Sequence, residues 1–170
     1  MKISTTNIKE LREKCGGGIM ECRNALVKAE GDMEKALEDL KAQGCLKAAK
    51  KAERITEQGL VEAYVHIGGR IGAIIELNCE TDFVARTDIF KDLAHNLAMQ
   101  VAAMCPQYIS EDEVPEEEKA DIEIDTACLL KQAYIKDPAM TIQDLIVEAI
   151  SKTGENIKVS RFARFELGVR

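Results

Sequence analysis

Side chains that could do chemistry are few in this chain, and they do not cluster along the sequence. The two histidines, His66 and His95, fall on a predicted strand and a predicted helix, and neither has a nucleophile or a metal ligand beside it. Isolated histidines are mostly surface or hydrogen-bonded polar groups. Glu80 and Asp82 stand close together, but acid–base catalysis also requires a substrate pocket, and no motif indicates one. The simpler interpretation of Asp82 is that it caps the helix that follows.

Six cysteines could form disulfides, bind a metal or act as nucleophiles, at positions 15, 22, 45, 79, 105 and 128. They lie far apart in a chain long enough to bury a core without disulfides, so we expect reduced thiols. No pair has the close spacing of a structural zinc site, so we expect no metal. A thiol-dependent transferase using Cys79 or Cys22 stays an alternative, although Cys79 falls in a predicted strand with no base beside it.

A glycine run and an isolated aromatic residue also stand out. The run Gly16-Gly17-Gly18 lacks the Lys-Ser/Thr pair of a phosphate-binding loop and follows a helix, so we interpret it as a helix stop and expect no cofactor. Phe83 sits in a short polar loop outside any periodic core pattern. An exposed Phe beside a carboxylate is a good partner-inserting pair. The alternative is that Phe83 folds back over the sheet edge.

The elements that position these residues begin with three short helices. Asn7 and Glu10 form a plausible N-cap pair for a first helix that ends at the glycine run. Apolar residues recur at helical spacing from Ile19 and again from Met33, and Gly44 is expected to close the third helix. The basic, alanine-rich segment 46–58 is predicted to be a solvated helical linker. Partner or nucleic-acid docking there is the alternative, and without interleaved aromatic residues it would be weak and salt-sensitive.

Residues 59–170 are predicted to form an α+β core. Residues 61–67 alternate in polarity and 71–77 are nearly all apolar, which indicates a β-hairpin. The loop 80–86 and a helix that Pro106 ends come next. The acidic segment 110–125 is expected to be a solvated loop or frayed helix start. Thr141 and Asp144 look like a cap pair for a helix that Gly154 ends, and 157–167 has the pattern of a third strand. The sheet is then small and antiparallel, with helices on one face.

Charge and hydropathy limit the classes of partner. Residues 1–58 carry 12 basic and 10 acidic side chains, a net charge of +2, and the rest carries 11 and 20, a net charge of −9. This argues against wrapping nucleic acid. No apolar run approaches the ~20 residues of a membrane-spanning helix, and the first residues resemble neither a signal peptide nor a transit peptide. We therefore expect a cytoplasmic protein, or an organellar one already processed, with no membrane partner.

Two long motifs resemble those of the bacterial elongation factor Ts family. They are LREKCGGGIMECRNAL at residues 11–26 and ELNCETDFVAR at residues 76–86, and the shorter stretches 47–51 and 154–157 are also similar to the family. The resemblance covers nearly the whole chain. It implies a nucleotide exchange factor for elongation factor Tu, without an active site of its own.

The resemblance also implies a domain organisation and two contact sites. Residues 1–45 would form a domain like the ubiquitin-associated (UBA) domain, 46–58 the linker and 59–170 the core. The loop formed by Thr81, Asp82, Phe83 and Val84 would act on the GTPase domain of elongation factor Tu, with Phe83 as a wedge that disturbs its nucleotide and Mg²⁺ site. Ile19 and Met20 would contact the same domain.

The sequence departs from the family in two places, and a different function stays open. Cys15 stands where the family usually has Thr, and the acidic segment lacks a helical piece. Because the short form of the family dimerises, and three strands alone would leave exposed edges, we expect a homodimer through the sheet. The alternative function is an adaptor that binds ubiquitin-like or nascent-chain partners. An adaptor would have no reason to combine a hairpin with the aromatic and acidic loop.

Overall fold

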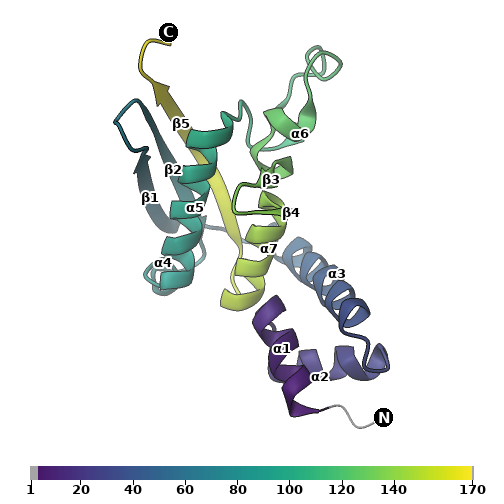
Figure 1. Ribbon diagram of the computed structural model, residues 1–170. Helices are drawn as coiled ribbons and strands as arrows, with labels where there is room; N and C mark the ends of the chain where they lie inside the picture. The colour runs from purple at the N-terminus through teal and green to yellow at the C-terminus, as the bar shows by residue number, and fades with distance from the viewer. Residues whose placement is uncertain (1–3, 170) are drawn as a thin grey trace.

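A three-stranded antiparallel sheet, with helices packed on one of its faces, is the framework of the larger part of the molecule (Figure 1). The structure is a computed structural model that describes residues 4–169. The middle strand β2 (Ile71–Cys79) pairs with β1 (Gln58–Val65) on one side and with β5 (Ile157–Glu166) on the other. The predicted α+β class, the hairpin and the last strand are confirmed.

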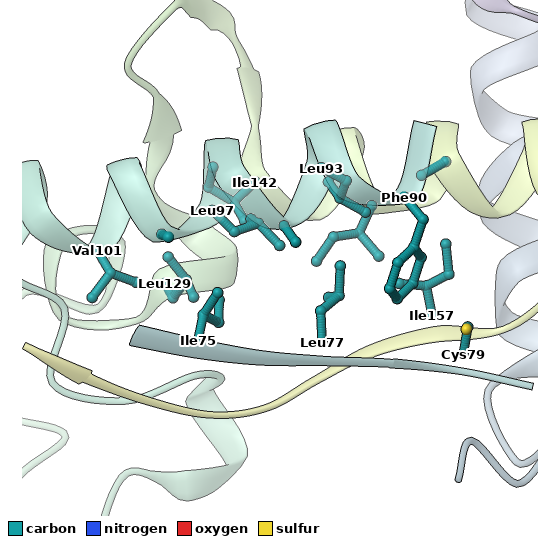
Figure 2. Close-up of a cluster of buried hydrophobic side chains, with 14 of the residues drawn as sticks. Ile75, Leu77, Cys79, Phe90, Leu93, Leu97, Val101, Leu129, Ile142 and Ile157 are labelled. Carbon is teal, nitrogen blue, oxygen red and sulfur yellow. The ribbon is translucent and has the colours of Figure 1, made fainter. Parts of the chain in front are cut away.

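The two faces of this sheet differ in what covers them. Residues opposite one another in antiparallel strands share a face, and the inner face carries the buried residues of β2, which alternate as Ala73, Ile75, Leu77 and Cys79. Helix α5 (Asp88–Met104) lies along this face (Figure 2) and contributes Phe90, Leu93, Leu97 and Val101 to the core. The helices lie on one face, as the sequence predicts.

Three helices at the N-terminus surround a separate small cluster of buried side chains. They are α1 (Thr5–Cys15), α2 (Ile19–Lys28) and α3 (Met33–Lys51), and the cluster comprises Leu11, Cys22, Ala25, Leu26 and Ala36. Gly16 ends α1 with φ 65°, as the glycine run predicts. The predicted cap at Asn7 is wrong, because Ser4 Oγ accepts a hydrogen bond from the Asn7 N–H at 3.1 Å and caps α1 one turn earlier.

The prediction that Gly44 closes the third helix is also wrong. Helix α3 runs through Gly44 to Lys51, so the first half of the predicted linker continues the helix. Gly44 is buried against α7, where an added Cβ would lie 3.3 Å from Ser151 Oγ and 3.4 Å from Val147 Cγ1. A glycine inside a helix therefore marks a close helix–helix approach here. Since α3 contributes Ala36 to the N-terminal cluster and Ala48 to the core, it joins the two.

A second small hairpin, which the sequence pattern does not indicate, follows the acidic segment. Its strands are β3 (Ala133–Tyr134) and β4 (Asp137–Thr141). The buried Gln100 of α5 positions it, since its amide nitrogen donates to the Ala133 carbonyl at 3.0 Å and its amide oxygen accepts from the Ile135 N–H at 3.0 Å. A lone glutamine on the apolar face of a helix is the signal that sequence reasoning overlooked.

The remaining helices are short apart from α7. The acidic segment forms a 3₁₀ turn at Glu111–Glu113, and α6 (Ile124–Ala127) and a 3₁₀ turn at Leu129–Lys131 follow it. Helix α7 (Ile142–Thr153) has the predicted capping box of Thr141 and Asp144, and Gly154 ends it with φ 80°. Among residues 4–169, no helix is long and apolar enough to cross a membrane.

The contrast between two phenylalanines tests this assignment of the core. Phe90 is 0% exposed and Phe83 is 78% exposed. We expect Phe90→Ala to lower the free energy of unfolding by about 3–5 kcal/mol, because it leaves a cavity between α5 and the sheet. The matched variant Phe83→Ala should change it by less than about 0.5 kcal/mol. Urea denaturation of both variants measures the difference, and equal losses would refute the assignment.

Candidate partner-binding site

The loop after β2 projects a single aromatic side chain into solvent. Thr81 is the N-cap of the one-turn helix α4 (Asp82–Ala85), and its Oγ accepts a hydrogen bond from the Val84 N–H at 3.5 Å. Val84 is partly buried and packs on the core, whereas Phe83 is 78% exposed. Phe83 therefore does not fold back over the sheet edge, and the loop presents it on a helical turn fixed by its neighbours.

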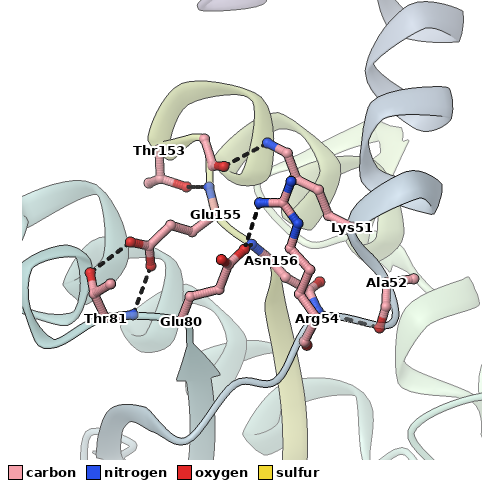
Figure 3. Close-up of polar contacts among 9 residues, drawn as sticks. Lys51, Ala52, Arg54, Glu80, Thr81, Thr153, Glu155 and Asn156 are labelled. Carbon is pink, nitrogen blue, oxygen red and sulfur yellow. Dashed lines mark hydrogen bonds and ion pairs between the residues drawn. The ribbon is translucent and has the colours of Figure 1, made fainter.

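A carboxylate from the turn between α7 and β5 holds the base of this loop (Figure 3). Glu155 accepts two hydrogen bonds from Thr81, one from the N–H at 3.0 Å and one from the hydroxyl at 2.6 Å. Hydrogen bonds to an ionised acceptor are about twice as strong as neutral ones. Residues 74 positions apart in the sequence are thereby joined at the point where α4 begins.

A second set of contacts ties the same region to the segment after α3. The Asn156 N–H donates to Glu80 Oε1 at 2.7 Å, and the Asn156 side chain donates to the carbonyls of Ala52 and Arg54 at 3.3 Å and 3.0 Å. The Arg54 guanidinium lies 3.3 Å from the same oxygen of Glu80. Asn156 is 2% exposed. Three chain segments therefore meet at a buried amide directly beneath the loop.

The basic residues of the predicted linker take part in this network. Lys51 Nζ donates to the Gly154 carbonyl at 2.7 Å, at the open C-terminal end of α7 (Figure 3). A cation is favourable there because unpaired carbonyls give a helix C-terminus a partial negative charge. Lys51 and Arg54 thus have structural partners, which a purely solvated linker would not provide.

Asp82 lies beside Phe83 and makes an ion pair with Arg86. Its carboxylate is 2.8 Å from the Arg86 guanidinium, and the two side chains are 46% and 76% exposed. The interpretation of Asp82 as a cap for α5 is wrong, because Thr87 Oγ accepts from the Phe90 N–H at 3.3 Å and takes that role. An exposed pair of this kind contributes about 0–1 kcal/mol, so an incoming partner can displace Arg86 at little cost.

Ile19 and Met20 form a second exposed apolar pair, on the first turn of α2. They are 58% and 60% exposed. The following residue, Glu21, accepts from the Gly18 N–H at 3.2 Å and pairs with Lys47 of α3. The hydrogen bond from Lys47, assisted by that from Gly18, lowers the pKa of Glu21. Within residues 4–169 no hydrogen bond or ion pair joins this turn to α4, and in Figure 1 the two lie on different parts of the molecule.

The thiols and histidines show no arrangement for catalysis in the described part of the chain. Burial raises the pKa of Cys79, whose Sγ donates to the Thr81 carbonyl at 3.1 Å, and burial also raises the pKa of Cys22, to about 11. Neither is an activated nucleophile. His95 Nδ1 lies 3.0 Å from Glu62 Oε1 at the surface. No three metal-ligating side chains gather among residues 4–169.

Comparison with known proteins identifies the family. A sequence model described as "Elongation factor TS" matches residues 45–124. The protein named elongation factor Ts from Thermotoga neapolitana is 48% identical over 194 aligned positions, which cover 99% of this chain and 98% of the relative. Its counterpart from Thermotoga maritima is 50% identical over the same shares.

This chain belongs to the elongation factor Ts family. A relative of the same name from Carboxydothermus hydrogenoformans is 47% identical over 98% of this chain and 89% of its own length. The aligned positions outnumber the 170 residues here, so these relatives of the elongation factor Ts family contain residues that this chain lacks. That the missing piece lies in the acidic segment stays a prediction.

Removal of the Glu155 carboxylate tests whether it holds the loop. Glu155→Ala leaves the Thr81 N–H and hydroxyl without their acceptor, so we expect a loss of about 1–3 kcal/mol in the free energy of unfolding. The control Glu148→Ala removes a partly exposed ion pair with Lys152, one turn apart on α7, and should cost about 0.5 kcal/mol or less. Hydrogen exchange at the Thr81 amide should speed up only in Glu155→Ala. Equal effects of the two variants would contradict the role of Glu155.

Proposed function

We propose that this chain is a guanine nucleotide exchange factor that binds elongation factor Tu carrying GDP and promotes release of the GDP during translation elongation. Membership of the elongation factor Ts family supports a role in elongation. The observation that carries the proposal is Phe83, an aromatic side chain 78% exposed on a loop whose base is fixed by partly buried hydrogen bonds. A large apolar side chain that is held out in solvent is suited to insertion into another protein.

Exchange of this kind requires differential binding and no bond chemistry. The factor must bind the nucleotide-free partner more tightly than the GDP-bound partner, and this coupling is reciprocal. Loosening GDP a thousandfold takes ~4 kcal/mol, at ~1.4 kcal/mol per tenfold. Exchange by this route needs no catalytic residue or cofactor. We therefore propose a protein-binding exchange factor without an active site of its own.

Phe83 can supply much of this free energy. A Phe buries ~150–250 Å² when it is fully enclosed, and at ~25 cal/mol per Å² the exposed part is worth about 3–5 kcal/mol before the costs of association. We propose that the ring wedges between two helices of the partner's GTPase domain and disturbs its nucleotide and Mg²⁺ site. Asp82 would stabilise the displaced backbone, and Thr81 and Val84 would position the turn.

Ile19 and Met20 provide the second proposed contact with the same GTPase domain. Both are exposed at the start of a helix whose first turn is fixed by Glu21. Helix α3 is continuous between the N-terminal cluster and the core, which supports a fixed relation between the two contact sites. From the family resemblance we also propose three units with a UBA-like first domain. They are residues 1–45, 46–58 and 59–170.

The outer face of the sheet supports the proposed homodimer. From the register, one row across it is Val65, Gly72 and Phe165, and the next is Ala63, Ile74 and Ala163. Val65, Phe165 and Ile74 are 67%, 68% and 45% exposed, and no helix covers them among residues 4–169. An uncovered apolar sheet face of this kind is a natural surface for a second copy. We propose a cytoplasmic homodimer with no direct contact to nucleic acid or membrane.

Measurement of GDP release tests the wedge. With fluorescent GDP on elongation factor Tu, Phe83→Ala should slow the accelerated release by about tenfold to a hundredfold, the value of a binding hot spot. The control Ile67→Ala removes a 93% exposed apolar side chain in the β1–β2 turn and should leave release unchanged. Unchanged acceleration by Phe83→Ala would discard the wedge. A wild-type chain that binds elongation factor Tu equally with and without excess GDP would favour the adaptor alternative.

Light scattering after size exclusion tests the homodimer. At micromolar concentrations the wild-type chain should have twice the mass of one chain, and Ile74→Lys should give monomers because it places a charge at the centre of the apolar rows. Lys158→Ala, an exposed change on β5 outside these rows, serves as the control. A wild-type monomer across the whole range would contradict the homodimer.

A further inference from the structure

Two thiols in the N-terminal helices lie in direct contact. Cys15 Sγ at the end of α1 is 3.6 Å from Cys22 Sγ in α2. Among residues 4–169 these are the only two thiols that contact each other, and all six cysteines are free. Cys22 belongs to the buried cluster at 0% exposure, whereas Cys15 is partly exposed. The pair therefore combines a thiol that reagents can reach with a thiol enclosed behind it.

The glycine run creates this contact. Gly16 adopts φ 65°, which ends α1 and turns the chain toward the start of α2. Gly17 passes directly beside both sulfur atoms, since an added Cβ would lie 3.3 Å from Cys15 Sγ and 3.6 Å from Cys22 Sγ. The Gly17 N–H also donates to Cys15 Sγ at 3.4 Å. A side chain at position 17 would crowd the pair, so the turn and the thiols fit together.

A cavity gives access to Cys15. It has a volume of about 300 Å³, lies between the N-terminal helices and the region of β4 and α7, and is lined by Cys15 and Gly17 on one side and by Met140 and Val147 on the other. Burial, followed by the hydrogen bond with Cys15, raises the pKa of Cys22 to about 11. Cys22 is therefore a weak first nucleophile, and attack on an external reagent falls to Cys15.

We propose that Cys15 and Cys22 form a redox-modification site, in which thiol–disulfide exchange with a small disulfide such as oxidised glutathione joins them reversibly. The Cys15 thiolate attacks one sulfur of the oxidised glutathione and releases one glutathione thiolate. The Cys22 thiolate then attacks Cys15 Sγ in the mixed disulfide and releases the second. Two protein thiols are oxidised, one glutathione disulfide is reduced to two thiols, and the two protons pass to the glutathione products.

The disulfide would enclose the turn that carries Ile19 and Met20. The ring closed by the bond spans residues 15–22 and includes all three glycines of the run. Because glycines give a chain its greatest conformational freedom, closing this ring removes mobility from the turn. Oxidation thereby changes the stiffness of an exposed apolar surface without any change in its composition. This inference rests on the thiol geometry and is independent of the proposed exchange function.

Trypsin places both thiols on one peptide, which makes the test direct. Cleavage after Lys14 and Arg23 releases residues 15–23, and cleavage after Lys41 and Lys47 releases residues 42–47 with the exposed Cys45 as an internal control. The full-length folded chain is equilibrated with oxidised glutathione, quenched with acid, alkylated and digested. We expect about nine tenths of peptide 15–23 to be two hydrogens lighter and unalkylated, and an excess of reduced glutathione to reverse this to about one tenth.

Two variants separate the pair from general thiol reactivity. Cys15→Thr removes one sulfur and should leave Cys22 alkylatable only after unfolding, with no glutathione attached. Cys45→Ser should leave the disulfide yield unchanged. Two alkylated thiols in peptide 15–23 under oxidised glutathione would overturn the proposal. So would a persistent glutathione adduct on Cys15, or a disulfide that forms only in urea.

Discussion

The carboxylate of Glu155 fixes the loop on which the proposed function depends. It accepts two hydrogen bonds from Thr81, at the residue where strand β2 gives way to α4. Asn156 and Glu80 add a second tie beside it, and Asn156 is buried. The turn between α7 and β5 thus positions a loop that lies more than seventy residues earlier in the sequence. Without this constraint the loop that carries Phe83 would lose more conformational freedom on binding, and that loss would reduce the net free energy of binding.

A rigid exposed side chain and a flexible one differ in what they can do to a partner. A side chain on a mobile loop adapts to the pocket that it meets, whereas a side chain on a held loop loses less conformational freedom on binding, which leaves more contact free energy to favour one state of the partner over the other. Asp82 extends this arrangement, because its ion pair with Arg86 is exposed and is exchanged at little cost. Partly buried hydrogen bonds therefore hold the base of the loop, while Phe83 and the Asp82–Arg86 ion pair stay accessible at its top.

The sequence predicted the elements whose periodicity is strong and missed those that depend on distant contacts. The hairpin, α5, α7 and the last strand follow from apolar spacing and capping residues, and they are confirmed. The prediction for Gly44 is wrong because glycine serves two purposes in helices. It can end a helix, and it can also let two helices pack closely, as Gly44 does against α7. The β3–β4 hairpin depends on Gln100, which lies more than thirty residues away. Phe83 was recognised by its lack of periodicity, but nothing local indicated that Glu155 holds its loop.

A double-mutant cycle on GDP release from elongation factor Tu tests the central claim most directly. Glu155 is proposed to act only by positioning the loop of Phe83, so Glu155→Ala should slow release in the wild-type background and have no further effect in a Phe83→Ala background. The interaction free energy would then equal the whole effect of Glu155→Ala. Additive effects of the two substitutions would contradict the account, because Glu155 would then act on the partner independently of the ring.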